Sequence, residues 1–176
     1  DMIYLKEISG PTGYLLDTAV HNIQLEVGKT SNQVVTDEEQ KANLTIYKEG
    51  EVLTGANVTE EGVSFVYEKR RQKGAVYNVY AAADIKRADG TVVYKQGALV
   101  KENLATGDDG SATLKGLYLG TYRVTEMKAP TNLICAGESK EVTLSYAGQN
   151  VEVAVGDLTF VNDRQKAEVF AEKQDK

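Results

Sequence analysis

Short stretches in which apolar and polar residues alternate restrict the fold of this chain more than any other feature. Alternation with a period of two is typical of β-strands that bury one face. Gly, Asn and Asp, which favour turns, separate the stretches. The strands do not alternate with long helical segments, as they would in a parallel α/β sheet, so the pattern predicts an all-β sandwich. The predicted strands are 43–48, 63–67, 75–80, 91–94, 112–114, 121–126, 141–146, 151–155 and 158–162.

Three short segments between these strands have their own signals. Residues 81–86 predict a single helical turn, and Val155-Gly156-Asp157 predicts a turn between the last two strands. Gly107-Asp108-Asp109-Gly110 predicts a hairpin turn, because Asp-Gly favours such turns and the ligand ladder of a calcium loop does not follow it.

The composition argues against several classes of function. The 176 residues include 20 Lys and Arg against 26 Asp and Glu, and the net charge of −6 argues against nucleic-acid binding, which needs a basic surface. No apolar run is long enough to predict a membrane span. Because Cys135 and His21 are the only residues of their types, an internal disulfide is excluded, and a catalytic triad, a metal centre or a cofactor site is not expected.

The chain also repeats itself. Gln40-Lys41-Ala42 recurs 125 residues later as Gln165-Lys166-Ala167, and residues 4–11 resemble residues 123–130, which lie 119 positions further on. A spacing near 125 residues suits tandem domains of immunoglobulin size and is too long for a solenoid repeat. The sequence therefore predicts the last strands of one repeat at 1–39, a complete repeat at 40–164 and the first strand of a following repeat at 165–176.

Three predicted strands each end an apolar, core-facing row with a polar residue. Burying even an uncharged amide without a partner costs on the order of 2–7 kcal/mol, so three such groups are expected to meet one another. The rows are Leu44, Ile46 and Lys48; Tyr122, Val124 and Glu126; and Leu158, Phe160 and Asn162.

A lysine, a carboxyl group and an amide in an apolar core can form a covalent bond. Burial disfavours the charged forms, and the neutral amine of Lys48 could attack the side-chain carbonyl carbon of Asn162, with Glu126 as general acid and base. The product is an isopeptide bond, formed once with loss of ammonia. The alternatives are a buried Lys–Glu ion pair that is hydrogen-bonded to the amide, or three strand-end residues that reach water. Lys69 is a rival nucleophile, because it alternates onto one face with two aromatic residues.

Residues 73–80, 107–120 and 122–130 together resemble the Cna B-type domain of Gram-positive adhesins and pilins. The distinctive elements are a Gly-Ala-x-Tyr-x-x-Tyr strand and a Tyr-x-Val-x-Glu-x-Lys-Ala-Pro box. The resemblance implies an immunoglobulin-like Greek-key β-sandwich in a secreted, cell-wall-anchored protein, with a Lys–Asn isopeptide bond that a Glu promotes.

The family positions map onto this chain residue by residue. The resemblance implies that Lys48 and Asn162 form the bond and that Glu126 promotes it. In the family the lysine lies closer to the Gly-Ala strand than Lys48 lies to Gly74, so residues 49–72 are expected to form an inserted hairpin. Lys48 is favoured over Lys69 because it has a counterpart, Lys173, in the next repeat.

The function expected on these grounds is that of a structural stalk module in a bacterial surface protein, with neighbouring repeats of the same polypeptide as its partners. The alternative is an adhesin module that binds a host extracellular protein or glycan. A partial second cross-linking site is also predicted from Glu7 and Asp37 in residues 1–39 and Lys173 in residues 165–176. An unpaired strand edge tends to recruit a strand, so Lys173 of the same or another copy could meet Asp37, and Lys and Asp can be joined by loss of water. The alternatives are that residues 1–39 pair with the neighbouring full repeat, or that both ends are truncation scars that pack loosely or fray.

Overall fold

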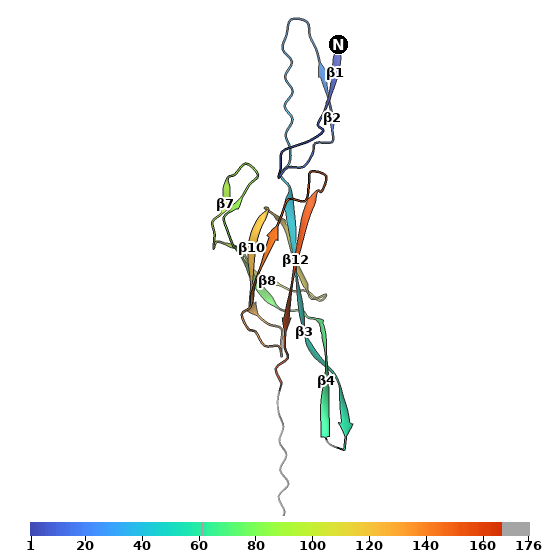
Figure 1. The fold of residues 1–176 in the computed structure, drawn as a ribbon, viewed down its shortest axis with the longest axis vertical. Coiled ribbons are helices and arrows are strands. Elements are labelled where there is room, and N and C mark those ends of the chain that lie inside the picture. The colour runs from blue at the N-terminus through green and yellow to red at the C-terminus, as the bar shows by residue number, and fades with distance from the viewer. Residues whose placement is uncertain (61, 167–176) are drawn as a thin grey trace, which may run out of the picture.

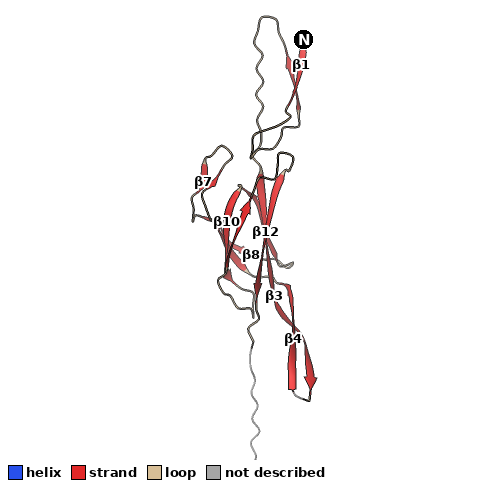
Figure 2. Cartoon of the chain, in the orientation of Figure 1, coloured by secondary structure: helices blue, strands red, loops and turns tan. Residues whose placement is uncertain are grey.

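The computed structural model describes residues 1–60 and 62–166, and within this part every regular element is a β-strand (Figures 1 and 2). These residues contain no helix that is long and apolar enough to cross a membrane. The molecule is elongated, with β1 and β2 at one end, a β-sandwich in the middle and the tip of the β3–β4 hairpin at the other end. The strands are β1 (Met2–Lys6), β2 (Val20–Gln24), β3 (Lys41–Thr59), β4 (Gly62–Arg71), β5 (Val76–Ala81), β6 (Ile85–Lys86), β7 (Val92–Tyr94), β8 (Leu99–Ala105), β9 (Ser111–Leu117), β10 (Gly120–Lys128), β11 (Ser139–Leu144) and β12 (Val153–Asn162).

Two sheets form the sandwich, so the predicted all-β sandwich is confirmed. One sheet has the order β11-β10-β5-β8, and the other is built around β3. The first part of β3 pairs with β9, its last part pairs with β4, and β12 runs parallel to β3 along its other edge. The first and last strands of the segment 40–164 are therefore direct neighbours.

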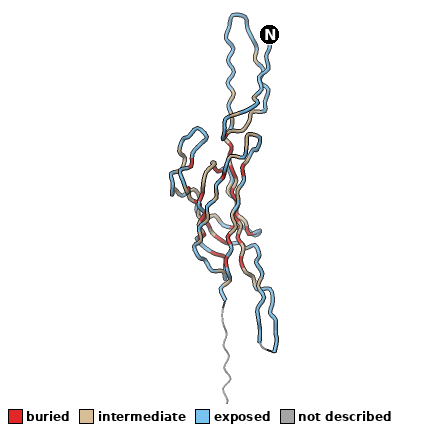
Figure 3. Tube along the Cα trace, viewed as in Figure 1, coloured by how far each residue is buried: buried red, intermediate tan, exposed pale blue. Residues whose placement is uncertain are grey.

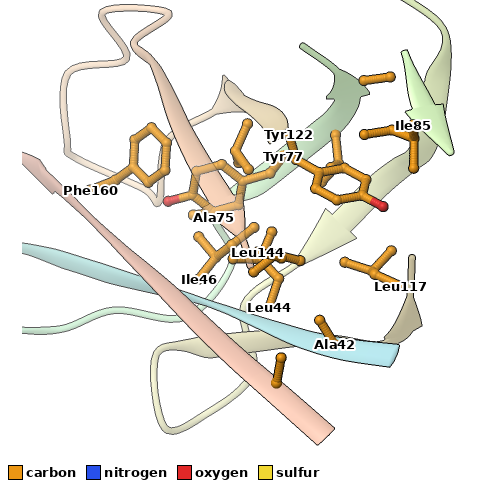
Figure 4. Packing of buried hydrophobic residues seen from close by; sticks show 14 residues of the cluster. Ala42, Leu44, Ile46, Ala75, Tyr77, Ile85, Leu117, Tyr122, Leu144 and Phe160 are labelled. Atoms are coloured by element: carbon orange, nitrogen blue, oxygen red, sulfur yellow. The ribbon is translucent and has the colours of Figure 1, made fainter. Parts of the chain in front are cut away.

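The core lies between these two sheets (Figures 3 and 4). From Lys41 to Gly50, β3 alternates between half-buried and buried residues, as its period-two sequence predicts. Inward-facing residues of β5 and β10 meet it from the opposite sheet, and Tyr77 packs on Phe160 with ring centroids 4.9 Å apart. Burying one large apolar side chain contributes about 1.5–3 kcal/mol, so this layer supplies the main driving force for folding.

The predicted turn at Val155-Gly156-Asp157 is wrong, because β12 continues through it. A Cβ atom at position 156 would lie 2.5 Å from Leu144 Cδ2, so the glycine permits the two sheets to approach closely. The helical turn predicted at 81–86 is also wrong. Ala81 ends β5 and Ile85 begins β6, and the Ala82 N–H donates to the Thr121 carbonyl oxygen at 2.9 Å instead of to a helical partner.

The turn predicted at Gly107–Gly110 forms, with the Gly110 N–H donating to the Gly107 carbonyl oxygen at 2.9 Å. It connects β8 and β9, which belong to different sheets, and so it is not the hairpin that Asp-Gly suggests. The inserted segment 49–72 does contain a hairpin, but β3 runs unbroken from the sandwich into it.

Residues 1–39 reproduce the end of the segment 40–164. In the β1–β2 pair Leu5 lies opposite His21, and in the β10–β11 pair Val124 lies opposite Lys140, which is the same register shifted by 119 positions. The loops that follow also agree, since a bridge from Tyr14 to Glu39 corresponds to one from Leu133 to Arg164. The domain boundaries at 39 and 164 stay predictions. Most of the segment 165–176, with Lys173, lies outside the described residues.

Candidate cross-linking site

Lys48, Glu126 and Asn162 come from three strands and both sheets. Lys48 lies on β3 and Asn162 on the neighbouring β12, whereas Glu126 lies on β10 in the opposite sheet. Each occupies an inward position of its strand, and their exposed fractions are 0%, 1% and 5%. The alternation of each strand thus carries its polar residue into the interior, where the three side chains meet.

The Glu126 carboxyl group contacts both of the other side chains. Its Oε1 lies 2.6 Å from Lys48 Nζ, and its Oε2 accepts a hydrogen bond of 2.8 Å from Asn162 Nδ2. The contact with Lys48 is close but poorly aligned for a hydrogen bond, and neither Nζ nor Oε1 has another hydrogen-bond partner among the described residues. The three groups are close together, and the carboxyl group lies between the amine and the amide.

Aromatic side chains surround this cluster. Tyr77 is the Cα partner of Glu126 on β5, and Phe160 is the Cα partner of Lys48 on β12. Both are fully buried and lie side by side (Figure 4). The Tyr77 hydroxyl is buried without a hydrogen-bond partner in the described part of the chain, and burial raises the pKa of Tyr77. The cluster therefore lies in a largely apolar environment that is closed to bulk solvent.

Desolvation lowers the pKa of Lys48, and the nearby Glu126 carboxylate opposes this effect only in part. A fully buried ammonium would need partners for three N–H groups, and the contact with Glu126 is the one that the described residues offer. The neutral form of the amine, which is the nucleophilic form, is therefore favoured more at this position than in water.

Lys69, the rival nucleophile, lies elsewhere. It is exposed on β4, opposite Glu51 of β3, on the hairpin that extends from the sandwich. Of the two lysines that the sequence left open, the structure places Lys48 beside Glu126 and Asn162. The geometry fits two interpretations, a buried ion pair hydrogen-bonded to an amide or the reactants of a cross-link.

Gly50 also shapes this site, although the sequence pattern was not used to predict it. Gly50 lies on the inward face of β3, two residues beyond Lys48, and it is the Cα partner of Asn162. A Cβ atom there would lie 2.2 Å from Leu133 Cδ1, so only glycine lets Leu133 close this end of the core. The sequence signal that could have identified Gly50 is its position, because it is the next inward residue after Ile46 and Lys48.

Glu7 and Asp37 also lie close together in the N-terminal segment. Their carboxylates come within 3.2 and 3.3 Å of the point that a Cβ atom would occupy at Gly10, and both residues are half-buried. The Asp17 N–H donates to Glu7 Oε2 at 2.8 Å. Beside them is a cavity of about 230 Å³ lined by Leu5, Lys6, Glu7, His21, Val35 and Asp37. Within residues 1–60 and 62–166, no group of His, Cys, Asp or Glu is arranged to hold a metal ion.

Two packed sheets with a buried Lys–Glu–Asn cluster define a structural β-sandwich module. Residues 40–159 match the family model of the SpaA prealbumin-like fold domain, and the chain belongs to that family. The resemblance to the Cna B-type domain of Gram-positive pilins and surface proteins is thereby confirmed. No curated protein matches the sequence.

One solved structure shows the same fold with a TM-score above 0.5, and two others align with lower scores. The TIE protein of Bacillus anthracis aligns with a TM-score of 0.61 and 22% identity, over 93% of this chain and 25% of that one. BcpA, the major pilin subunit of Bacillus cereus, aligns with a TM-score of 0.43 and 21% identity, over 70% of this chain and 29% of that one. The major pilin SpaA of Corynebacterium diphtheriae aligns with a TM-score of 0.46 and 17% identity, over 70% and 31%. The chain thus spans between a quarter and a third of each of these relatives.

Proposed function

We propose that residues 40–164 are a stalk module of a secreted, cell-wall-anchored bacterial surface protein, stiffened by an isopeptide bond between Lys48 and Asn162. The observation that carries the proposal is the position of one buried carboxyl group, with Oε1 at the amine of Lys48 and Oε2 at the amide nitrogen of Asn162. The first contact brings the carboxyl group to the nucleophile, and the second brings it to the nitrogen that would leave, so one group can serve both ends of the reaction.

The chemistry follows from these contacts. The neutral amine of Lys48 attacks Cγ of Asn162, a bond forms between Nζ and Cγ, the bond from Cγ to Nδ2 breaks, and ammonia leaves. Glu126 accepts the proton that the amine loses and supplies the proton that the departing nitrogen gains. The carboxyl group ends the reaction unchanged. The bond forms once in each molecule, needs no cofactor and gives no turnover, so the module is not an enzyme in the usual sense.

The position of the bond suits a load-bearing role. Tension along a tandem array would reach the module at the start of β3 and leave it at the end of β12, which is parallel to β3. With Lys48 joined to Asn162, the load passes from the first strand to the last through covalent bonds. The residues between 48 and 162, with their sheet hydrogen bonds, are spared.

Intact-protein mass spectrometry tests the proposal. The mass of the purified chain should be lower than the sequence mass by one ammonia molecule, and Lys48→Ala should remove this deficit. Lys69→Ala is the matched control, because it removes an exposed lysine from the neighbouring strand and should keep the deficit. A chain with the full sequence mass, or a deficit that depends on Lys69, would refute the assignment.

We propose in addition that Glu7 and Asp37 are two parts of a second site of the same kind. Their proximity at Gly10 and the adjoining cavity support this, because a lysine on a first strand would approach from that side. Lys173 is the proposed lysine of a strand donated by the same or another copy. Its amine would attack Cγ of Asp37 and release water. Covalent multimers on a denaturing gel, or a Lys173–Asp37 peptide lighter by one water, would support strand donation. A strictly monomeric chain without such a peptide would exclude it.

A further inference from the structure

The hairpin formed by residues 51–59 of β3 and 62–71 of β4, here called the ribbon, has one apolar face. Cα pairing places Leu53 opposite Tyr67, Ala56 opposite Phe65 and Val58 opposite Val63. Residues opposite each other in an antiparallel pair share a face, and the next position but one on each strand lies on the same side. These apolar pairs therefore form a continuous stripe.

The other face of the ribbon is more polar. There Asn57 lies opposite Ser64, Gly55 opposite Val66 and Val52 opposite Glu68, so this face has two valines among polar residues and glycine. The asymmetry is that of a strand pair with one covered and one more solvated face.

The apolar stripe is exposed in the part of the molecule that the structure describes. The exposed fractions are 78% for Val58, 57% for Val63, 56% for Phe65 and 43% for Leu53. Residues 53–59 and 62–71 are exposed except for Tyr67, which is half-buried (Figure 3). A two-stranded hairpin alone is at best marginally stable in water, and a contiguous exposed apolar patch marks an interaction surface.

The polypeptide leaves the sandwich along this same face. The Arg164 N–H donates to Glu51 Oε2 at 3.1 Å, and Lys166 Nζ lies 3.4 Å from the same oxygen and 4.8 Å from the centroid of the Tyr67 ring. Glu51 and Tyr67 belong to the positions of the apolar face. Figure 1 shows the ribbon extending past the sandwich at the end where β12 finishes.

The chain beyond Arg164 begins as the module itself begins. The Gln165 N–H donates to the Asn132 carbonyl oxygen at 2.9 Å, just as the Gln40 N–H donates to that of Gly13 at 2.9 Å. At the upstream joint, between residues 1–39 and 40–164, Gln40 is followed directly by β3 of the β-sandwich. A sandwich that followed the same start at residue 165 would lie beside the apolar face of the ribbon.

We infer that the apolar face of the ribbon docks against the β-sandwich domain that follows residue 164 and braces the joint between the two modules. The inference rests on the tandem arrangement in the proposed function, but it does not require the isopeptide bond. The ribbon supplies the contact from the upstream module, and the following module covers Leu53, Val63 and Phe65.

The upstream joint shows that such joints are held by specific contacts. Leu16 donates its N–H to the Gln149 carbonyl oxygen at 3.0 Å, and the Tyr146 hydroxyl donates to the Tyr14 carbonyl oxygen at 2.9 Å. The surface beside the first residues of β3 is also partly apolar. Lys41 Nζ lies 3.3 Å from the centroid of the Tyr118 ring, and Tyr118 and Leu119 line a cavity of about 170 Å³. An equivalent surface on the next module offers the ribbon apolar partners.

The test uses a protein in which residues 1–164 are followed directly by a second copy of 40–164, which preserves the join because Gln40 aligns with Gln165. Hydrogen–deuterium exchange is measured for the ribbon amides in this protein and in the 176-residue chain. The tandem protein carries two ribbons of the same sequence, and only the first is followed by a module. Exchange at residues 53–58 and 63–67 should therefore have two phases, with half of these amides slower by roughly tenfold or more than in the 176-residue chain, because docking adds to the free energy of local opening.

Two variants sharpen the result. Val63→Thr with Phe65→Thr keeps residues that favour strands but removes the apolar surface, so it should abolish the added protection. Ser64→Ala, on the opposite face, should leave the protection intact. Each copy of residues 40–164 should lose one ammonia molecule in all of these proteins, which gives one in the 176-residue chain and two in the tandem protein, so failure of the docking and failure of the cross-link are distinguishable. Equal exchange in the tandem and single proteins would overturn the inference. Dimers of the 176-residue chain that Phe65→Thr dissolves would also overturn it and would assign the face to a second copy.

Discussion

Replacing Glu126 by Gln tests the cross-link with the smallest change in shape. The Gln side chain has the same volume, and its amide can still pair with Asn162, but it cannot pass a proton from the amine of Lys48 to the departing nitrogen. We expect the variant to fold as the same β-sandwich and to lack the ammonia deficit.

The size of the stability loss follows from the position of the bond. A bond from Lys48 to Asn162 joins the first strand of the module to the last and closes a loop of about 100 residues, which the chain-entropy treatment of disulfides values at about 4–5 kcal/mol. For a domain of this size that corresponds to a melting temperature lower by about 10–25 °C. The assay is thermal unfolding followed by circular dichroism, with trypsin digestion below the transition as a second measure.

Asn162→Ala is the matched control for this experiment. It also prevents the bond, but it leaves the pair between Lys48 and Glu126 in place. The missing bond is common to both variants and is the largest change in each. They should therefore melt at similar temperatures, well below the wild type. The reasoning fails if Glu126→Gln retains the ammonia deficit. It also fails if the deficit disappears while the melting temperature stays at the wild-type value.

Three further predictions concern the surroundings of the site. Gly50→Ala should destabilise the linked and unlinked proteins alike by about 1–3 kcal/mol in denaturant unfolding, because the new methyl group overlaps Leu133; an unchanged midpoint would contradict the close packing. Tyr77→Phe removes a buried hydroxyl that lacks a partner within the described chain, so stability should stay the same or rise by about 1 kcal/mol; a clear loss would mean that the hydroxyl is bonded. Burial lowers the pKa of Lys48 from its ordinary value of 10.5, so between this lowered pKa and pH 10.5 the unfolded chain of Asn162→Ala binds more protons than the folded one. The free energy of unfolding of this variant should therefore rise with pH relative to the wild type, whose amine is consumed in the bond; parallel pH profiles would contradict this.

Much of the strand content could be predicted from the sequence, because the side-chain period of a strand is local. The alternation through Leu44 and Ile46 carries Lys48 to the inward face whatever the sheet order. The same reasoning placed Glu126 and Asn162 inside, and the cost of burying them unpaired predicted that they would meet. The internal repeat was also visible, and the registers of β1–β2 and β10–β11 agree with it.

Local signals failed where contacts between distant segments outweighed them. Gly156 looked like a turn residue but lies within β12. A glycine is needed there because Leu144 of the other sheet occupies the space beside it. Residues 81–86 have a helical composition, but hydrogen bonds to a neighbouring strand hold them extended or bent. Neither partner is close in the sequence, so no local pattern could reveal it.

The choice between Lys48 and Lys69 also depended on tertiary structure. Both lysines continue an apolar row, and period two gives each of them the same signal. They differ because the part of β3 that carries Lys48 is covered by the opposite sheet, whereas the part of β4 that carries Lys69 extends beyond it. The sequence by itself determined which residues share a face. Only the packing of the two sheets decided which faces are buried, because burial depends on segments that are distant in the chain.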